Sequence, residues 1–152
     1  MVNEPELIDG AVEILKLVRE LGYEIIIITN QYIINENFIT LEQYHSFTNS
    51  LMNLLTMEGI EVLDIFYCRH ARWENCACIK PNGGMIKEAL VKYPAIDLKK
   101  SFVIGDSQVD IELAHRLNMR GYGININEKP RFPTVTYINS IKELSQLLCM
   151  DH

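Results

Sequence analysis

A short stretch rich in cysteine and histidine constrains this chain more than any other feature. Cys68 and His70 follow an apolar run, Leu63 to Tyr67, and after five residues come Cys76 and Cys78. Thiolate sulfur and imidazole nitrogen are the ligands that Zn²⁺ takes in closed tetrahedral sites. Residues two apart at a strand end point to the same side, so each pair can face one ion. The spacing therefore predicts a structural zinc loop.

Two alternative roles for these cysteines stay open. Cysteine is often buried as a small apolar residue, and two cysteines can also form a disulfide. However, three of the four cysteines and one of the four histidines lie within eleven residues, which favours a metal over unrelated burial. Four protein ligands leave no open position for water or substrate, so the expected zinc is structural and not catalytic.

The composition is typical of one globular domain with a proper core. The chain has 152 residues, of which 48% are hydrophobic and 22% are charged. Its net charge of −6 gives a nucleic-acid partner no electrostatic support, and no apolar run approaches membrane-spanning length. The first residues do not resemble a signal peptide, and clustered cysteines bind metal in reducing compartments, so we expect a cytoplasmic protein without nucleic-acid or membrane partners.

Strands and helices alternate along the chain. The β-branched run Tyr23 to Ile28 has no polar alternation, which is typical of a strand buried on both faces of a parallel sheet. Thr40 with Gln43, and Ser140 with Glu143, have the spacing of capping boxes. The expected strands cover 23–28, 63–67, 101–104, 122–126 and 135–138, and the expected helices cover 11–21, 40–58, 85–93, 107–118 and 140–148. This alternation predicts an α/β fold with a mostly parallel sheet in a single domain, 1–152.

Several polar residues follow the expected strands, where open α/β sheets bind their ligands. Thr29 and Asn30 follow one strand, Asp106 follows another with Asp110 four residues later, and Lys80 follows the zinc loop. Each of them also suits a simpler role, as a turn, a helix cap, a partner of a helix N-terminus or a surface lysine. Together they offer donors for phosphate oxygens and carboxylates for Mg²⁺.

The order of these residues resembles the haloacid dehalogenase (HAD) superfamily. The match is closest to the subfamily of histidinol-phosphate phosphatase and D-glycero-D-manno-heptose-1,7-bisphosphate phosphatase. The motifs that carry it are Thr29-Asn30-Gln31, the zinc loop, Lys80-Pro81, the segment from Gly105 to Asp110 and, as a lead-in to the first helix, Ile8-Asp9-Gly10. The resemblance covers about residues 5–127. It implies a three-layer, doubly wound, HAD-like Rossmannoid sheet into which the zinc loop is inserted.

The resemblance also implies an enzyme, a Mg²⁺-dependent phosphomonoester hydrolase. Its substrate would be a small phosphorylated metabolite, either a sugar phosphate of the heptose-bisphosphate type or histidinol phosphate. In the family one aspartate forms an aspartyl-phosphate and a second acts as general acid and base. The implied site residues are Thr29, Asn30 and Lys80 for catalysis and substrate binding, Gln31 and Ser107 for substrate binding, and Asp106 and Asp110 for Mg²⁺.

The family's first motif, a strand followed by Asp-x-Asp-Gly, does not occur in these residues. In the superfamily that strand lies between the strands that end here at Ile28 and Ile104. Without it two apolar edges lose their partners, so we expect a domain truncated at its N-terminus, inactive alone and able to self-associate through these edges.

Two further departures from the family concern the substrate. Ile79 replaces the subfamily's phosphate-contacting Arg, and residues 32–37 replace a segment containing Gly and Arg. These differences leave a second hypothesis open, a catalytically inactive relative that the zinc stabilises and that binds a phosphorylated ligand or a protein.

Overall fold

The computed structural model describes residues 5–7 and 10–150 of the chain. The chain divides into two compact units, residues 1–79 and residues 80–152, and each is described by itself. Ile8 and Asp9, which resemble the family's lead-in to its first helix, lie outside the described residues. The expectation of a single domain stays a prediction.

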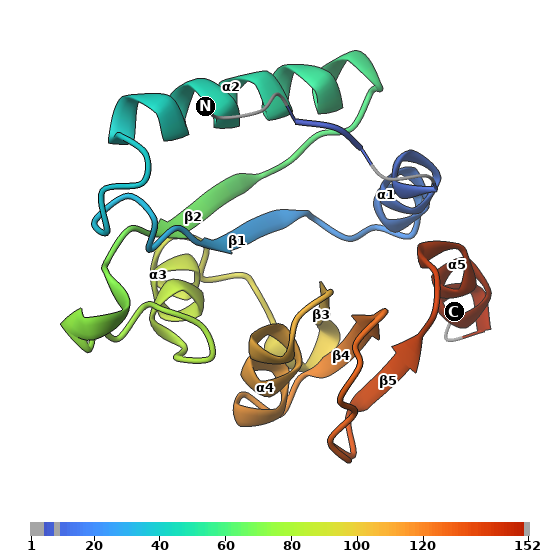
Figure 1. The fold of residues 1–152 in the computed structure, drawn as a ribbon. Helices are drawn as coiled ribbons and strands as arrows, with labels where there is room; N and C mark the ends of the chain where they lie inside the picture. Colours follow the sequence, from blue (N-terminus) through green and yellow to red (C-terminus); the bar gives the residue numbers. More distant parts are fainter. Residues whose placement is uncertain (1–4, 8–9, 151–152) are drawn as a thin grey trace. The chain divides into compact units, whose positions relative to one another are not determined.

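The first unit is a two-stranded parallel sheet with two helices (Figure 1). Its elements are α1 (Ala11–Glu20), β1 (Ile26–Asn30), α2 (Leu41–Met57), β2 (Asp64–Cys68) and a 3-10 turn, η1 (Arg72–Glu74). The register places Asn30 opposite Cys68. The carboxyl ends of β1 and β2 therefore meet, so the polar residues at the end of β1 lie beside the first cysteine of the zinc loop.

Helix α2 begins at the capping box that the sequence predicts. The Gln43 N–H donates to Thr40 Oγ1 at 3.0 Å, and the Thr40 N–H donates to Gln43 Oε1 at 2.8 Å. Farther along the helix, the ring of Tyr44 packs against that of Tyr67 on β2, with 4.6 Å between centroids. These contacts fix where α2 begins and attach it to the sheet, which it covers on one face (Figure 1).

The second unit is a three-stranded parallel sheet in the order β3-β4-β5. Its elements are α3 (Gly84–Lys92), η2 (Leu98–Lys100), β3 (Phe102–Gly105), α4 (Gln108–Arg116), β4 (Arg120–Ile124), β5 (Val135–Ile138) and α5 (Ile141–Met150). Helix α4 packs on all three strands, and α5 contacts β5. The side chains of Ile111, Leu113, Leu144 and Leu148 are almost fully buried and form the core of this unit.

The predicted α/β class is confirmed, because every strand pairing among the described residues is parallel. Some details differ from the expectations. Strand β4 ends at Ile124, two residues before the predicted end, and the next apolar residue, Ile126, would meet any side chain placed at Gly123. The Glu143 carboxylate accepts from the N–H of Asn139, one residue before the expected cap Ser140.

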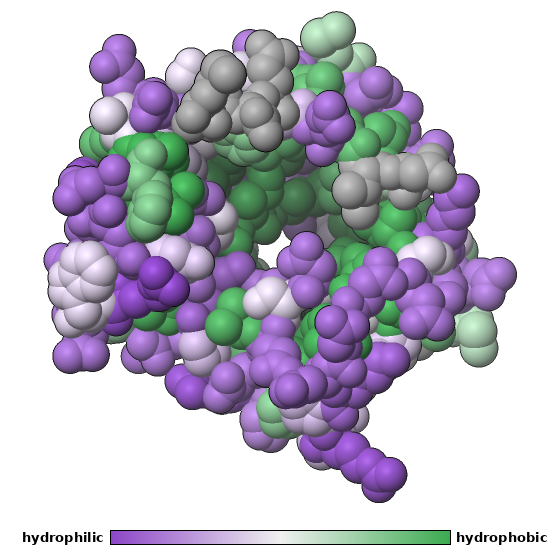
Figure 2. All heavy atoms as spheres, viewed as in Figure 1, coloured by the Kyte–Doolittle hydropathy of each residue, from purple (hydrophilic) through white to green (hydrophobic). Residues whose placement is uncertain are grey.

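The outermost surface is mostly hydrophilic on the face drawn in Figure 2, where purple residues predominate. The large hydrophobic side chains that are nevertheless exposed include Phe38, Met57, Trp73, Val91 and Met150. Single exposed apolar residues of this kind are normal in globular proteins. Within residues 5–7 and 10–150, no helix combines the length and the apolar character that a membrane crossing requires.

Candidate functional site

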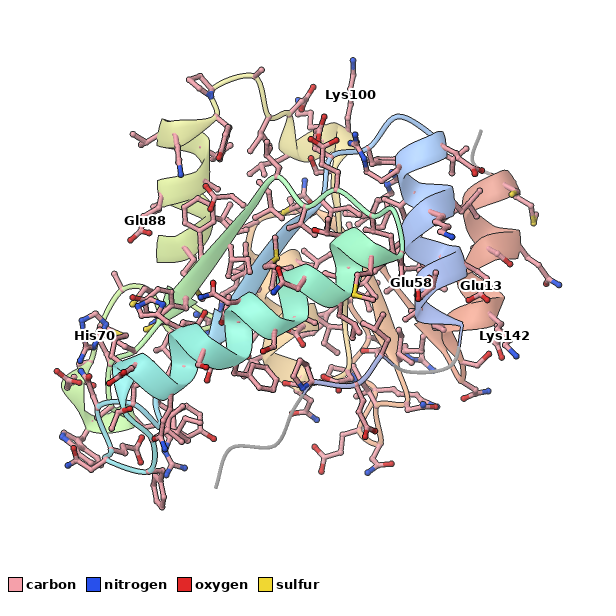
Figure 3. The ribbon with its side chains drawn as sticks, turned by 90° about the horizontal axis from the view of Figure 1, so that it is seen from above. Glu13, Glu58, His70, Glu88, Lys100 and Lys142 are labelled. Carbon is pink, nitrogen blue, oxygen red and sulfur yellow. The ribbon has the colours of Figure 1, made fainter. Side chains whose placement is uncertain are left out.

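The four predicted zinc ligands converge on the loop after β2, where Figure 3 labels His70. Their ligand atoms all lie within 4.8 Å of one another. Cys68 Sγ lies 3.4 Å from Cys76 Sγ and 3.5 Å from His70 Nδ1, which in turn lies 3.0 Å from Cys78 Sγ. A tetrahedral zinc ion separates such atoms by about 3.5–3.8 Å. All four cysteines are free, so the set fits zinc and not a disulfide.

Burial favours the protonated form of these thiols, whereas a bound metal ion would favour the thiolate form. Burial raises the pKa of the Cys68 thiol, so that a proton stays on this sulfur when no cation is present. Burial also acts to raise the pKa of Cys76, but hydrogen bonds, first from the Ile79 N–H, outweigh it and leave the pKa below its usual value. Zinc binds thiolates, so it must displace the Cys68 proton, and zinc affinity falls as the pH falls.

Hydrogen bonds hold the segment after β1 against the zinc loop. The Gln31 N–H donates to the Cys68 carbonyl at 2.7 Å, and the Asn35 N–H donates to the Arg69 carbonyl at 3.2 Å. The Asn35 amide accepts from Arg69 Nε and donates to Glu74 Oε2, both at 2.9 Å. The zinc loop therefore determines the shape of the chain that follows Thr29 and Asn30.

An ion pair strengthens the same connection. Arg72 Nη2 lies 2.8 Å from Glu36 Oε1, the Arg72 backbone N–H donates to Glu36 Oε2 at 3.1 Å, and the guanidinium lies 4.5 Å from the centroid of the Tyr32 ring. The side-chain hydrogen bond from Arg72 holds the pKa of Glu36 below its ordinary value. A carboxyl with a lowered pKa stabilises the fold above its unfolded-state pKa, and this contribution is lost as acid protonates Glu36.

Thr29 and Asn30, predicted to follow the strand and to bind a phosphoryl group, are instead the last two residues of β1. Gln31 Nε2 donates to Thr29 Oγ1 at 2.9 Å. The Thr29 oxygen thus accepts one bond while its own O–H can donate elsewhere, as binding of a phosphate oxygen requires. Gln31, expected to bind substrate, contacts Thr29 in this structure and orients it.

The other predicted residues lie in the second unit. Lys80 Nζ lies 2.5 Å from Asp110 Oδ1, and both side chains are nearly 90% buried. Ser107 caps α4 by accepting from the Val109 N–H, and Asp106 is exposed directly after β3. Mg²⁺ typically takes one or two carboxylates, so Asp106 fits a magnesium ligand, whereas Asp110 already shares one oxygen with Lys80.

Gly105 at the end of β3 makes room for this ion pair. A Cβ placed at Gly105 would overlap the side chain of Asp110. Only glycine therefore allows the carboxylate to lie across the strand end and reach Lys80. In the sequence Gly105 stands in a turn motif, and nothing in that motif predicts the close approach of Asp110.

Comparisons with known proteins agree on one family. The family model described as "Polynucleotide kinase 3 phosphatase" matches residues 6–122. A D-glycero-alpha-D-manno-heptose-1,7-bisphosphate 7-phosphatase of Photorhabdus laumondii is 37% identical over 144 residues, which are 88% of this chain and 78% of the relative. A D-glycero-beta-D-manno-heptose-1,7-bisphosphate 7-phosphatase of Helicobacter pylori J99 is 42% identical over 103 residues, which are 67% of this chain but only 59% of the relative.

A solved structure shows the same fold. It is the D,D-heptose 1.7-bisphosphate phosphatase from B. bronchiseptica, complexed with magnesium and phosphate. It aligns with a TM-score of 0.85 over 95% of this chain and 84% of that chain. The sequence identity is 18%, so this likeness is evidence for the HAD-like α/β fold alone.

Replacing Cys76 with serine tests the zinc centre. We expect Cys76→Ser to reduce bound zinc from about one ion per chain, and to lower the melting temperature, because a structural zinc site needs all four ligands and contributes to folding. Metal analysis and thermal unfolding measure the two effects. The control is Cys149→Ser on α5, where the cysteine is exposed. Equal zinc content in both variants would contradict the assignment.

Adding one methyl group at Gly105 tests the close approach of Asp110. Gly105→Ala should displace the Asp110 carboxylate from Lys80 and lower the free energy of unfolding by about 1–3 kcal/mol, as overpacking does. Urea unfolding measures the change. Gly83→Ala is a matched control, because its Cβ would meet Leu117 at an ordinary 3.6 Å. Equal stability of the two variants would show that a Cβ at Gly105 causes no steric conflict.

Proposed function

The chain belongs to the HAD superfamily, in the group of heptose-1,7-bisphosphate 7-phosphatases and histidinol-phosphate phosphatases, and we propose on this basis that it serves Mg²⁺-dependent phosphomonoester hydrolysis. The proposed substrate is a small phosphorylated metabolite, a sugar phosphate of the heptose-bisphosphate type or histidinol phosphate. The observation that carries this proposal is the buried Lys80–Asp110 pair in a chain that also keeps Thr29 and Asn30.

Each retained group suits the demands of phosphoryl transfer, which are mainly positioning and charge stabilisation. The hydroxyl of Thr29 and the amide of Asn30, in the first unit, are suited to donate to phosphoryl oxygens, and the Lys80 ammonium, in the second unit, is suited to offset phosphoryl charge. Asp110 keeps the ammonium in place by its ion pair. Mg²⁺, when held by Asp106, would supply further positive charge for a phosphoryl group.

The reaction also needs an aspartate nucleophile, and these 152 residues contain no Asp-x-Asp-Gly. We propose that turnover requires this motif on a strand added beside β1, and that the 152 residues alone bind a phosphorylated ligand without hydrolysing it. A polynucleotide 3′-phosphate, which the name of the family model suggests, is a less suitable substrate because the chain carries a net charge of −6.

One observation favours a second candidate function. Ile79 stands where the subfamily has an arginine that contacts substrate phosphate, so one expected cation is replaced by an apolar side chain. A catalytically inactive relative, stabilised by zinc, would bind a phosphorylated ligand or a protein partner and would not need this cation.

Adding the first motif to the chain separates the two functions. A chimera with a family strand ending in Asp-x-Asp-Gly before residue 5 should release phosphate from a heptose bisphosphate or from histidinol phosphate when Mg²⁺ is present. Lys80→Ala in the chimera should lower kcat by about 100-fold or more, as loss of a transition-state donor does. Lys99→Ala, at an exposed lysine of η2, is the control. A folded, zinc-loaded chimera without turnover would favour the inactive relative.

We also propose that the chain self-associates through strand edges. β1 and β3 each lie at the edge of their sheet, and their residues are only half-buried, although the sequence predicts that the strand at β1 is covered on both faces. Apolar edges of this kind pair readily with other chains. Light scattering after gel filtration should give a mass above the 17.5 kDa of one chain. The chimera, whose added strand covers the edge of β1, should associate less. A monomer that unfolds cooperatively would argue against this proposal.

A further inference from the structure

A cavity of about 300 Å³ lies in the first unit, between the segment that leads into α2 and the zinc loop. Its lining includes Ile34, Asn37, Ile39, Leu41 and Arg69. Neither the zinc ligands nor the phosphoryl-binding candidates Thr29 and Asn30 line it. Its volume is at the small end of the range for ligand pockets, roughly 300–1,000 Å³, so it suits a small molecule.

Arg69 is the one charged side chain among the described residues that line this cavity. Its Nε donates to Asn35 Oδ1 at 2.9 Å, and its carbonyl accepts from the Asn35 N–H, so the guanidinium is held on one side. A guanidinium fixed in this way still has the Nη groups with which arginine binds carboxylates and phosphates in pairs of hydrogen bonds.

The neighbouring carboxylates have other partners. Glu36 pairs with Arg72, while Glu74 accepts from the Ala71 N–H and from the Asn35 amide. Hydrogen bonds from Asn35 and Ala71 lower the pKa of Glu74 most, and the charges of His70 and, least of all, Arg69 lower it further. Among the described residues, however, no carboxylate forms an ion pair with Arg69. The cavity wall therefore keeps a net positive charge.

The start of α2 does not replace Arg69 as the anion-binding group. A helix N-terminus attracts anions through its unpaired N–H groups. Here the N–H groups of Thr40 and Gln43 are already bonded within the capping box, which leaves those of Leu41 and Glu42 to assist the guanidinium. Arg69 therefore supplies the only full positive charge among the described residues that line the cavity.

Aliphatic side chains share the remaining wall with Phe38 and with the polar side chains of Asn37, Thr40 and Gln43. Ile34 is 4% exposed, so it is held firmly in the unit, and Ile39 and Leu41 line the cavity beside it. A bare inorganic anion would gain nothing from these surfaces, whereas a carbon skeleton would bury apolar area against them. The lining thus favours an anion with an organic part.

From these contacts we propose that the cavity is a binding site for a small organic anion, whose charged group contacts Arg69 and whose carbon skeleton packs on Ile34 and Ile39. The site does not depend on the proposed phosphatase function, because none of the phosphoryl-binding candidates lines it.

A titration with n-butyl phosphate tests the proposal on the zinc-loaded chain, because its alkyl chain is apolar. Amide NMR signals of Asn37 and Leu41 and the Arg69 Nε–H signal should shift, and neutral 1-butanol at the same concentration should leave the Arg69 signal unchanged. Arg69→Gln should weaken this binding at least tenfold, whereas Lys16→Gln, at an exposed lysine of α1, should not change it. Inorganic phosphate should bind more weakly than butyl phosphate.

A second variant guards against a folding defect in Arg69→Gln. Ile39→Glu leaves Arg69 and its bonds to Asn35 in place but adds a negative charge to the wall, so it too should weaken anion binding at least tenfold. Shifts at Thr29 and Asn30 report the phosphoryl site separately. The proposal is overturned if only those two residues respond, if nothing responds, or if folded Arg69→Gln and Ile39→Glu bind like the unchanged chain. If inorganic phosphate binds equally well, the proposal that the ligand has a carbon skeleton is wrong.

Discussion

The first unit depends on one constraint: three cysteine thiols and one histidine imidazole must converge to form the zinc site. The zinc ligands occupy a loop that has little regular structure of its own, only the short turn η1. A metal ion would hold this loop in shape, and the loop in turn carries Arg69, Arg72 and Glu74, which bond to the segment after β1. The geometry around Thr29 and Asn30 therefore depends on the metal site.

The second unit reaches a defined geometry in a different way. No metal is needed to place Lys80, because Asp110 on the first turn of α4 holds it and Gly105 leaves the necessary space. A buried ion pair of this kind contributes little net stability, since desolvation opposes the attraction, but removing one partner leaves an unpaired charge. Its main effect is to hold an ammonium group in one orientation.

The sequence was enough to predict some parts of this structure and not others, for physical reasons. The zinc ligands, the capping box at Thr40 and the alternation of strands and helices depend on neighbours in the chain, so their spacing reveals them. The pair Glu36–Arg72, by contrast, joins residues that lie 36 positions apart, and no local pattern indicates which charges will meet. The same holds for Lys80 and Asp110. The resemblance to the family indicated their order along the chain, but it did not indicate that their side chains are in contact.

The hydrogen bond from the Gln31 N–H to the Cys68 carbonyl has a thermodynamic consequence. Gln31 also donates to Thr29 Oγ1, so two bonds connect a predicted zinc ligand to the hydroxyl that we propose for substrate binding. Binding linkage is reciprocal: if zinc makes phosphate bind more tightly by stiffening this path, phosphate must make zinc bind more tightly by the same factor. Under zinc scarcity, the phosphorylated ligand would then help the protein to retain its metal.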